Sequence, residues 1–220
     1  MSEIAAFVAD RLGHRPTDVS LFQRALTHSS AARESYERLE FLGDRVLGLV
    51  MARALYERYP GEPEGQLSRR YNALVARETC AEIGRGIGIP ALLRLGKQAR
   101  EDGASQSDNV VGDAVEALIG ALLLDGGFEA AQRFILAGWG PYLAGQGHAP
   151  HHPKSALQEM AEGLGRKPPA YEVIDRSGPA HAPRFTVRVS VRGLGEAEGQ
   201  GTSKQDAETA AAQALLDKLQ

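Results

Sequence analysis

Apolar side chains recur at helical spacing through the first two thirds of the chain, separated by three or four positions within each stripe. Gly13, Asp18 and the Pro60-Gly61 pair supply start and stop signals. Together these patterns predict helices over residues 3–12, 18–26, 35–59, 63–84, 110–124 and 128–143. The buried stripe of the 35–59 helix is expected to contain Leu39, Leu42, Val46, Leu49 and Val50. The polar stretch 96–108 predicts an exposed loop within this all-helical unit.

The last third of the chain has a mixed pattern. Helical spacing over 155–164 is followed by three strand-like segments, of which FTVRVSV alternates most clearly. We expect strands over 170–176, 184–192 and 195–201, and a closing helix over 201–219. This α-β-β-β-α order predicts a small α+β domain.

Between these parts lies the segment AGQGHAPHHP, at 144–153, which has no periodic apolar pattern. It predicts a flexible to semi-extended linker. We therefore divide the chain into a helical domain at 1–145, a linker at 146–153 and an α+β domain at 154–220. The histidines in the linker are interpreted as incidental, because no fixed scaffold would hold a coordination geometry there.

Length and composition indicate a folded chain and allow either one large domain or two unequal domains. Among 220 residues, 43% are hydrophobic and 24% charged, which is sufficient for a core. The single cysteine, Cys80, excludes an intramolecular disulfide, and no signal-peptide pattern opens the chain. The longest nearly apolar run, at 114–124, contains Glu116 and is too short to span a bilayer. We expect a cytoplasmic protein that does not contact membranes.

The charge balance is slightly acidic, with a formal net charge of −3. Neither the part before residue 153 nor the part after it has more bases than acids. Any contact with nucleic acid must therefore come from locally placed cations or helix ends, because no broad positive field is present.

Two stripes of carboxylates are the strongest chemical signal. Glu37, Glu40 and Asp44 lie three and four positions apart and so share one face of the 35–59 helix, where like charges repel. Asp113 and Glu116 are the charged residues of an otherwise apolar or small segment, VVGDAVEALIGALLL. Partly buried carboxylates must be paired, protonated or bound to metal. Gly112 and Gly120 would let another helix approach closely, and the 35–59 helix is the obvious candidate.

Together, Glu40, Asp44, Asp113 and Glu116 would surround one cavity. Oxygen donors without histidine or thiolate suit a hard divalent cation, Mg²⁺ first and Mn²⁺ second. A di-iron site is an alternative, but neither stripe has the Glu-x-x-His pattern it uses. Another alternative is that arginines such as Arg38 or Arg45 neutralise the acids without any metal. Arg45 lies about 100° around the helix from Asp44, however, and is poorly aimed at it. His28 is interpreted as a structural residue of a turn.

Several motifs together resemble bacterial ribonuclease III. They are ERLEFLGDRVL at 37–47, GDAVEALIGALLLD at 112–125, ALTHSS at 25–30 and EGQLSRRYNALV at 64–75. The resemblance implies a Mg²⁺-dependent endonuclease without an organic cofactor that cuts both strands of double-stranded RNA. Its products would carry 5′-phosphate and 3′-hydroxyl ends, and its substrates would include structured precursors such as ribosomal RNA. By this resemblance Glu40, Asp113 and Glu116 are metal ligands, Asp44 is a further candidate ligand, and Asp44 and Glu116 are the catalytic acids.

The resemblance also implies a homodimer in which each subunit cuts one strand. The residue matching Phe41 packs into the partner subunit in such proteins. The local sequence pattern alone is more simply explained if Phe41 is a core residue. Glu37 and Glu64 match acidic positions outside the metal set. Arg45 and the single Gly103 depart from the family pattern.

The α+β segment, with GPAH at 178–181 and GTSK at 201–204, resembles a double-stranded RNA-binding domain. Such domains recognise duplex RNA mainly by shape. The resemblance implies contacts with two minor grooves and the phosphates between them, made by Gln158, Glu159, His181, Thr202, Ser203 and Lys204. Gln205 replaces a lysine usual in the family, so we expect weaker RNA binding with a shallower salt dependence.

Two other functions are weighed against the nuclease. A non-catalytic duplex-RNA binder or ribosome-assembly protein would not need all four acids. A metal phosphohydrolase for small substrates would not need the appended RNA-binding module.

Overall fold

A computed structural model describes residues 2–145, 153–179 and 183–219 of the chain. Its contacts divide the chain into two compact units, Met1–Pro150 and His151–Gln220. The predicted linker falls outside the described residues except for Pro153, which begins a helix. Its flexibility therefore stays a prediction.

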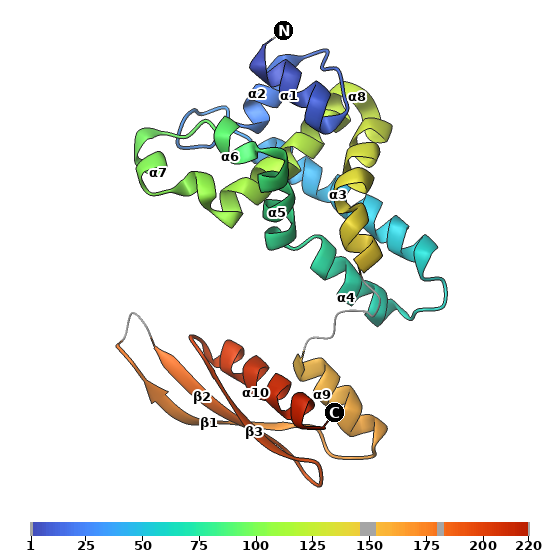
Figure 1. The fold of residues 1–220 in the computed structure, drawn as a ribbon, viewed down its shortest axis with the longest axis vertical. Coiled ribbons are helices and arrows are strands. Elements are labelled where there is room, and N and C mark those ends of the chain that lie inside the picture. The colour runs from blue at the N-terminus through green and yellow to red at the C-terminus, as the bar shows by residue number, and fades with distance from the viewer. Residues whose placement is uncertain (1, 146–152, 180–182, 220) are drawn as a thin grey trace. The chain divides into compact units, whose positions relative to one another are not determined.

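The first unit is all-helical (Figure 1). Its elements are α1 Glu3–Leu12, α2 Val19–Ala25, α3 Glu37–Arg58, α4 Glu64–Leu74, α5 Arg77–Ile87, α6 Ile89–Leu92, α7 Lys97–Glu101, the 3-10 helix η1 Ala104–Gln106 and α8 Asp108–Gly145. The predicted caps are confirmed: Gly13 adopts φ 66° after α1, and the Asp18 side chain accepts from the Ser20 N–H at 2.9 Å.

Helices α3 and α8 pack against each other at the centre of this unit. Gly127, at φ 77°, interrupts α8 and divides it into two helical legs, as the two predicted helices require. The second leg buries Trp139 completely, and its Nε1–H donates to the Leu74 carbonyl at 2.8 Å. The second leg of α8 therefore joins the end of the unit to α4, near its middle.

Three expectations for this unit are wrong. The predicted 63–84 helix is two helices, because Ala76 is extended (ψ 144°) between α4 and α5. The stretch 96–108 is not a simple loop, since it contains α7 and η1. Leu49 is 59% exposed rather than part of the core.

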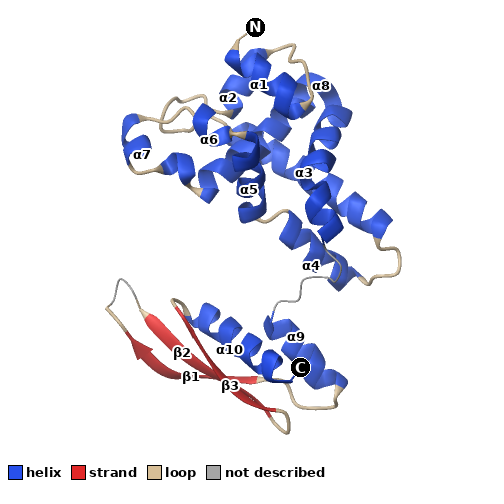
Figure 2. Cartoon of the chain, in the orientation of Figure 1, coloured by secondary structure: helices blue, strands red, loops and turns tan. Residues whose placement is uncertain are grey.

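The second unit has the predicted α-β-β-β-α order (Figure 2). Helix α9 Pro153–Gly163 is followed by the antiparallel strands β1 Ala170–Ser177, β2 Arg184–Val191 and β3 Gly195–Gly201, in the order β1-β2-β3, and by α10 Lys204–Leu219. Val187 and Val189 alternate inward from β2 and are fully buried. Helix α10 lies close to β3 because Gly199 has no side chain: a Cβ there would lie 2.7 Å from the Ala211 Cα.

Within the described residues, the helices are all too short or too polar to cross a membrane.

Candidate functional site

A backbone-to-backbone contact between α3 and α8 places the two acidic stripes opposite each other. A Cβ built at Gly43 would lie 2.6 Å from the Glu116 carbonyl carbon and 2.9 Å from the Gly120 nitrogen. A Cβ at Gly120 would lie 3.1 Å from the carbonyl carbon of Leu39. These distances leave no room for a side chain, so the two glycines determine how closely the helices approach.

The predicted role of Gly120 is confirmed, whereas Gly112 lets a different helix approach from the one expected. A Cβ at Gly112 would meet the Arg77 carbonyl oxygen at 3.3 Å, so this glycine faces α5 rather than α3. Gly43 was not anticipated. Its signal is its position one helical turn after Glu40, between the two acids of the stripe.

Glu40, Asp113 and Glu116 form an electrostatically coupled group. All three are half-buried. The pKa of Glu116 is raised to about 7, first by burial and then by the charges of Asp113 and Glu40. The pKa of Glu40 is raised by burial and by Asp113, and that of Asp113 is raised by burial. Mutual repulsion of buried carboxylates is the condition that a bound cation relieves.

Tyr36 holds Asp113 in place. Its phenol is 3% exposed and donates to Asp113 Oδ2 at 3.2 Å. Burial and the Asp113 charge raise the pKa of Tyr36, which keeps it a donor. The imidazole of His28 meets the Tyr36 ring edge-on, with centroids 5.6 Å apart. The Ser30 N–H donates to His28 Nδ1 at 3.0 Å, which confirms His28 as a residue of a structural turn.

Two arginines face the acids, Arg77, which was not anticipated, and Arg45. Arg77, at the beginning of α5, lowers the pKa values of Glu40, Asp113 and Glu116 against the effect of burial. The expectation that Arg45 is poorly aimed at Asp44 is wrong, because its guanidinium forms an ion pair with that carboxylate. A long arginine side chain at the surface spans the angular offset, and its guanidinium also lies 4.7 Å from the Phe41 ring centroid.

The donor set suits a hard cation in its chemistry but is not preassembled. Within the described part of the chain, no group of three or more histidine, cysteine, aspartate or glutamate side chains is arranged to hold a metal ion. Glu40, Asp113 and Glu116 interact with one another, whereas the Asp44 carboxylate pairs with Arg45. Ligation by these oxygens would therefore require side-chain rotation about the fixed α3–α8 contact.

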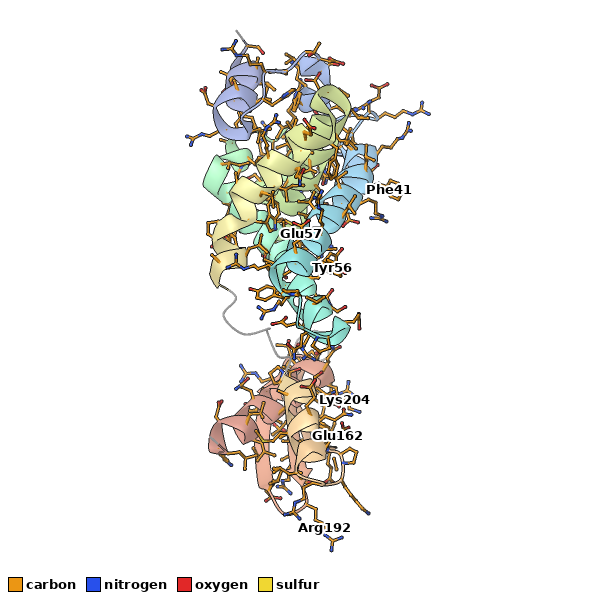
Figure 3. The ribbon with its side chains drawn as sticks, turned by 90° about the vertical axis from the view of Figure 1, so that its right-hand side faces the viewer. Phe41, Tyr56, Glu57, Glu162, Arg192 and Lys204 are labelled. Atoms are coloured by element: carbon orange, nitrogen blue, oxygen red, sulfur yellow. The ribbon has the colours of Figure 1, made fainter. Side chains whose placement is uncertain are left out.

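The outer face of α3 is unusually apolar. Phe41, Leu49 and Tyr56 are 64%, 59% and 73% exposed, and Figure 3 shows Phe41 and Tyr56 projecting from the helix. The interpretation of Phe41 as a core residue is therefore wrong. Next to Tyr56 lies a mostly apolar hollow of about 360 Å³, also lined by Leu55, Leu67 and Tyr71. Large exposed apolar patches are typical of interaction surfaces.

The second unit exposes most of the predicted RNA-contact residues. Gln158 and Glu159 are exposed on α9, and Thr202, Ser203 and Lys204 are exposed at the beginning of α10. His181 lies outside the described residues. Gln158 and Lys204 line a common hollow of about 670 Å³, whereas Glu159, Thr202 and Ser203 do not line it.

The beginning of α10 is capped by the chain itself. Ser203 Oγ accepts from the Asp206 N–H at 3.1 Å, and Asp206 Oδ2 accepts from the Ser203 N–H at 3.1 Å. This reciprocal capping box identifies Ser203 as the cap. Two of the N–H groups that could bind an anion here are therefore already used.

Comparisons with known proteins agree across the chain. A family model described as Ribonuclease-III-like matches residues 18–139, and one described as Double-stranded RNA binding motif matches residues 153–219. The chain is 58% identical to the Ribonuclease 3 of Zymomonas mobilis over 97% of this chain and 87% of that protein. It is 50% identical to the Ribonuclease 3 of Dinoroseobacter shibae, over 99% and 96% respectively.

Solved structures resemble the first unit. The crystal structure of the ribonuclease III nuclease domain from Campylobacter jejuni matches with a TM-score of 0.61 and 32% identity, over 64% of this chain and 97% of that one. A second structure of that domain, described as flexible in a region involved in dimer formation, matches with a TM-score of 0.59 and 33% identity, over 60% and 93%.

Proposed function

The chain belongs to the ribonuclease III family, and from that premise we propose that it is a Mg²⁺-dependent endoribonuclease that hydrolyses both strands of double-stranded RNA. Its products carry 5′-phosphate and 3′-hydroxyl ends. Its substrates are structured precursors such as those of ribosomal and messenger RNA. The observation that carries the proposal is the half-buried group of carboxylates held together where α3 and α8 touch.

In this proposal Glu40, Asp113 and Glu116 hold the cation, with Asp44 as a further ligand and Mn²⁺ as a substitute. The bound cation supplies Lewis acidity and offsets negative charge at the scissile phosphate. Tyr36 orients Asp113 through its hydrogen bond. Asp44 and Glu116 handle protons at the reacting phosphate, and Arg45 fixes Asp44 until the substrate arrives.

The second unit, proposed to begin at residue 154 after a linker, supplies recognition of the duplex. Gln158 and Glu159 would enter one minor groove and His181 the next. Thr202, Ser203 and Lys204 would contact the phosphates between them. The support is the exposure of the described members of this set and the match to the RNA-binding motif over 153–219.

We further propose that two copies pair through α3, so that two acidic groups serve the two strands. Phe41, Leu49 and Tyr56 supply an apolar patch that water disfavours. Replacement of Phe41 by Ser is expected to shift the protein from dimer to monomer in sedimentation velocity. Leu164→Ser, which changes an exposed apolar residue of the other unit, is the control.

The decisive test compares wild type with Glu116→Gln on a long RNA duplex. We expect wild type to cut the duplex to short fragments with Mg²⁺ and to be inactive in EDTA. Glu116→Gln should bind but cut at least about 100-fold more slowly, since it loses a charged oxygen donor. Glu57→Gln removes an exposed acid of α3, the helix that packs against α8, and should leave cutting unchanged; Glu57 is paired with Arg53 at 2.8 Å.

End-labelling of the products decides the chemistry. A 5′-phosphate blocks labelling by polynucleotide kinase until phosphatase is added, whereas a cyclic phosphate end would contradict the proposed hydrolysis. Binding without cutting by wild type in Mg²⁺ or Mn²⁺ would instead support the non-catalytic RNA-binding alternative.

A further inference from the structure

The hollow in the second unit lies where α9, β1 and α10 begin. Its lining includes Lys154, Gln158, Tyr171, Lys204 and Glu208. Helices α9 and α10 pack against each other, which brings Lys154 at one helix start near Lys204 at the other (Figure 3 labels Lys204). Two lysines are thus concentrated in a domain that has no overall excess of bases.

Glu208 forms an ion pair with each of these lysines. Its Oε2 lies 2.5 Å from Lys154 Nζ, and its Oε1 lies 3.8 Å from Lys204 Nζ. The Glu208 side chain is only 14% exposed, whereas that of Lys204 is 65% exposed. The carboxylate therefore sits beneath the two ammonium groups, where partial burial weakens screening by salt.

Tyr171 adds a hydrogen-bond donor to the same hollow. Lys154 Nζ lies 4.9 Å from the centroid of its ring. Among the described residues, the buried Tyr171 hydroxyl has no hydrogen-bond partner. Burial and the Glu208 charge raise the pKa of Tyr171 to about 12, so the hydroxyl keeps its proton. A buried donor without an acceptor, beside two ammonium groups, suits an oxygen-rich anion.

We propose that this hollow receives a phosphate of duplex RNA and that Glu208 is an internal counter-anion that lowers its affinity. Lys154 and Lys204 carry two positive charges, of which Glu208 cancels one. An RNA phosphate must compete with this carboxylate for both lysines. Glu208 thereby sets a weak, shape-dependent mode of binding, and Lys154 and Tyr171 become RNA contacts alongside Lys204. This inference rests on the proposed recognition of duplex RNA.

The test measures binding of the full-length chain to a long RNA duplex in EDTA, where no cutting is expected, across a range of KCl concentrations. Glu208→Gln should lower Kd about threefold to tenfold near 0.1 M salt and steepen the log-log salt slope by roughly 0.9 for each additional phosphate neutralised. Gln preserves the shape of the side chain and removes only its charge.

The matched control is Glu198→Gln. Glu198 pairs with Arg188 at 2.7 Å across β2 and β3 and does not line the hollow, although its loss changes the net charge equally. The salt slope of this variant should equal that of wild type. An equal gain in both variants would mean that only total charge matters, which overturns the proposal.

A double-mutant cycle separates the counter-anion from a structural clamp. In the Lys154→Gln background, Glu208→Gln should give a smaller gain, because one of its two partners is already absent. A folded Glu208→Gln protein that binds no more tightly than wild type would overturn the proposal. If Glu208→Gln melts below the assay temperature, Lys154→Gln decides: the proposal requires weaker binding and a shallower slope, and unchanged binding refutes it. Failure of wild type to bind duplex RNA would refute the proposed function itself.

Discussion

Replacement of Gly43 by Ala tests the contact on which the acidic site depends. The added methyl would lie 2.6 Å from the Glu116 carbonyl carbon, while ordinary contacts begin near 3.4 Å. The obstacle is backbone of α8, so the helices must separate by roughly 1 Å. Overpacking of this kind costs about 1–3 kcal/mol or more, against about 1 kcal/mol gained from the better helix propensity of Ala. We expect a net loss of roughly 1–2 kcal/mol in the free energy of unfolding.

The same substitution should also slow cutting strongly, even while the protein stays folded. The clashing carbonyl belongs to Glu116, so a displacement of about 1 Å moves a catalytic carboxylate and is expected to slow cutting about 100-fold. Urea denaturation followed by circular dichroism gives the stability, and cleavage of a labelled duplex gives the rate. A Cβ at Gly86 meets nothing within 4 Å, so Gly86→Ala should be neutral or slightly stabilising and fully active. Wild-type stability and rate in Gly43→Ala would refute the proposed role of the helix contact.

Three further changes test separate contacts. Tyr36→Phe removes the hydrogen bond to Asp113 and should raise the Mg²⁺ concentration for half-maximal cutting about tenfold, with near-native urea unfolding. Burial alone would raise the pKa of Asp125, but hydrogen bonds from His14, Thr17 and Asp18 lower it below its ordinary 3.8. The ionised Asp125 therefore stabilises the fold above about pH 5, and this stabilisation is lost as pH falls through the folded pKa. Melting temperatures from pH 3 to 6 should therefore fall less steeply in Asp125→Asn than in wild type. Gln205→Lys should steepen the salt slope of RNA binding by about 0.9, and an unchanged slope would contradict that expectation.

Local signals predicted the elements whose ends are determined locally. Gly13 and Asp18 act on neighbouring backbone groups, so the local sequence was sufficient to predict where α1 ends and where α2 begins. The break between α4 and α5 has no glycine or proline at its centre. At this break the Arg77 carbonyl packs against Gly112 of α8. This contact joins segments that are distant in sequence, so no local sequence pattern could have predicted it.

The same distinction applies to the site. Helical spacing was enough to group Glu40 with Asp44 and Asp113 with Glu116. Tyr36 is the N-cap residue of α3 and Arg77 begins α5, and Tyr36 meets Asp113 across 77 positions of sequence. Their side chains are ordinary in their own segments, so only the tertiary packing shows that they face the acids.

The acidic net charge illustrates why local contacts decide the electrostatics of this chain. Lys154 and Lys204 share Glu208, so the two cations that line the hollow already have an internal partner. A phosphate that approaches them replaces an existing interaction rather than an ion from solution. Fewer counterions are then released than the number of cations near RNA would imply. The salt dependence of binding should therefore be shallower than a count of basic residues predicts, and it should steepen when an internal acid such as Glu208 is removed.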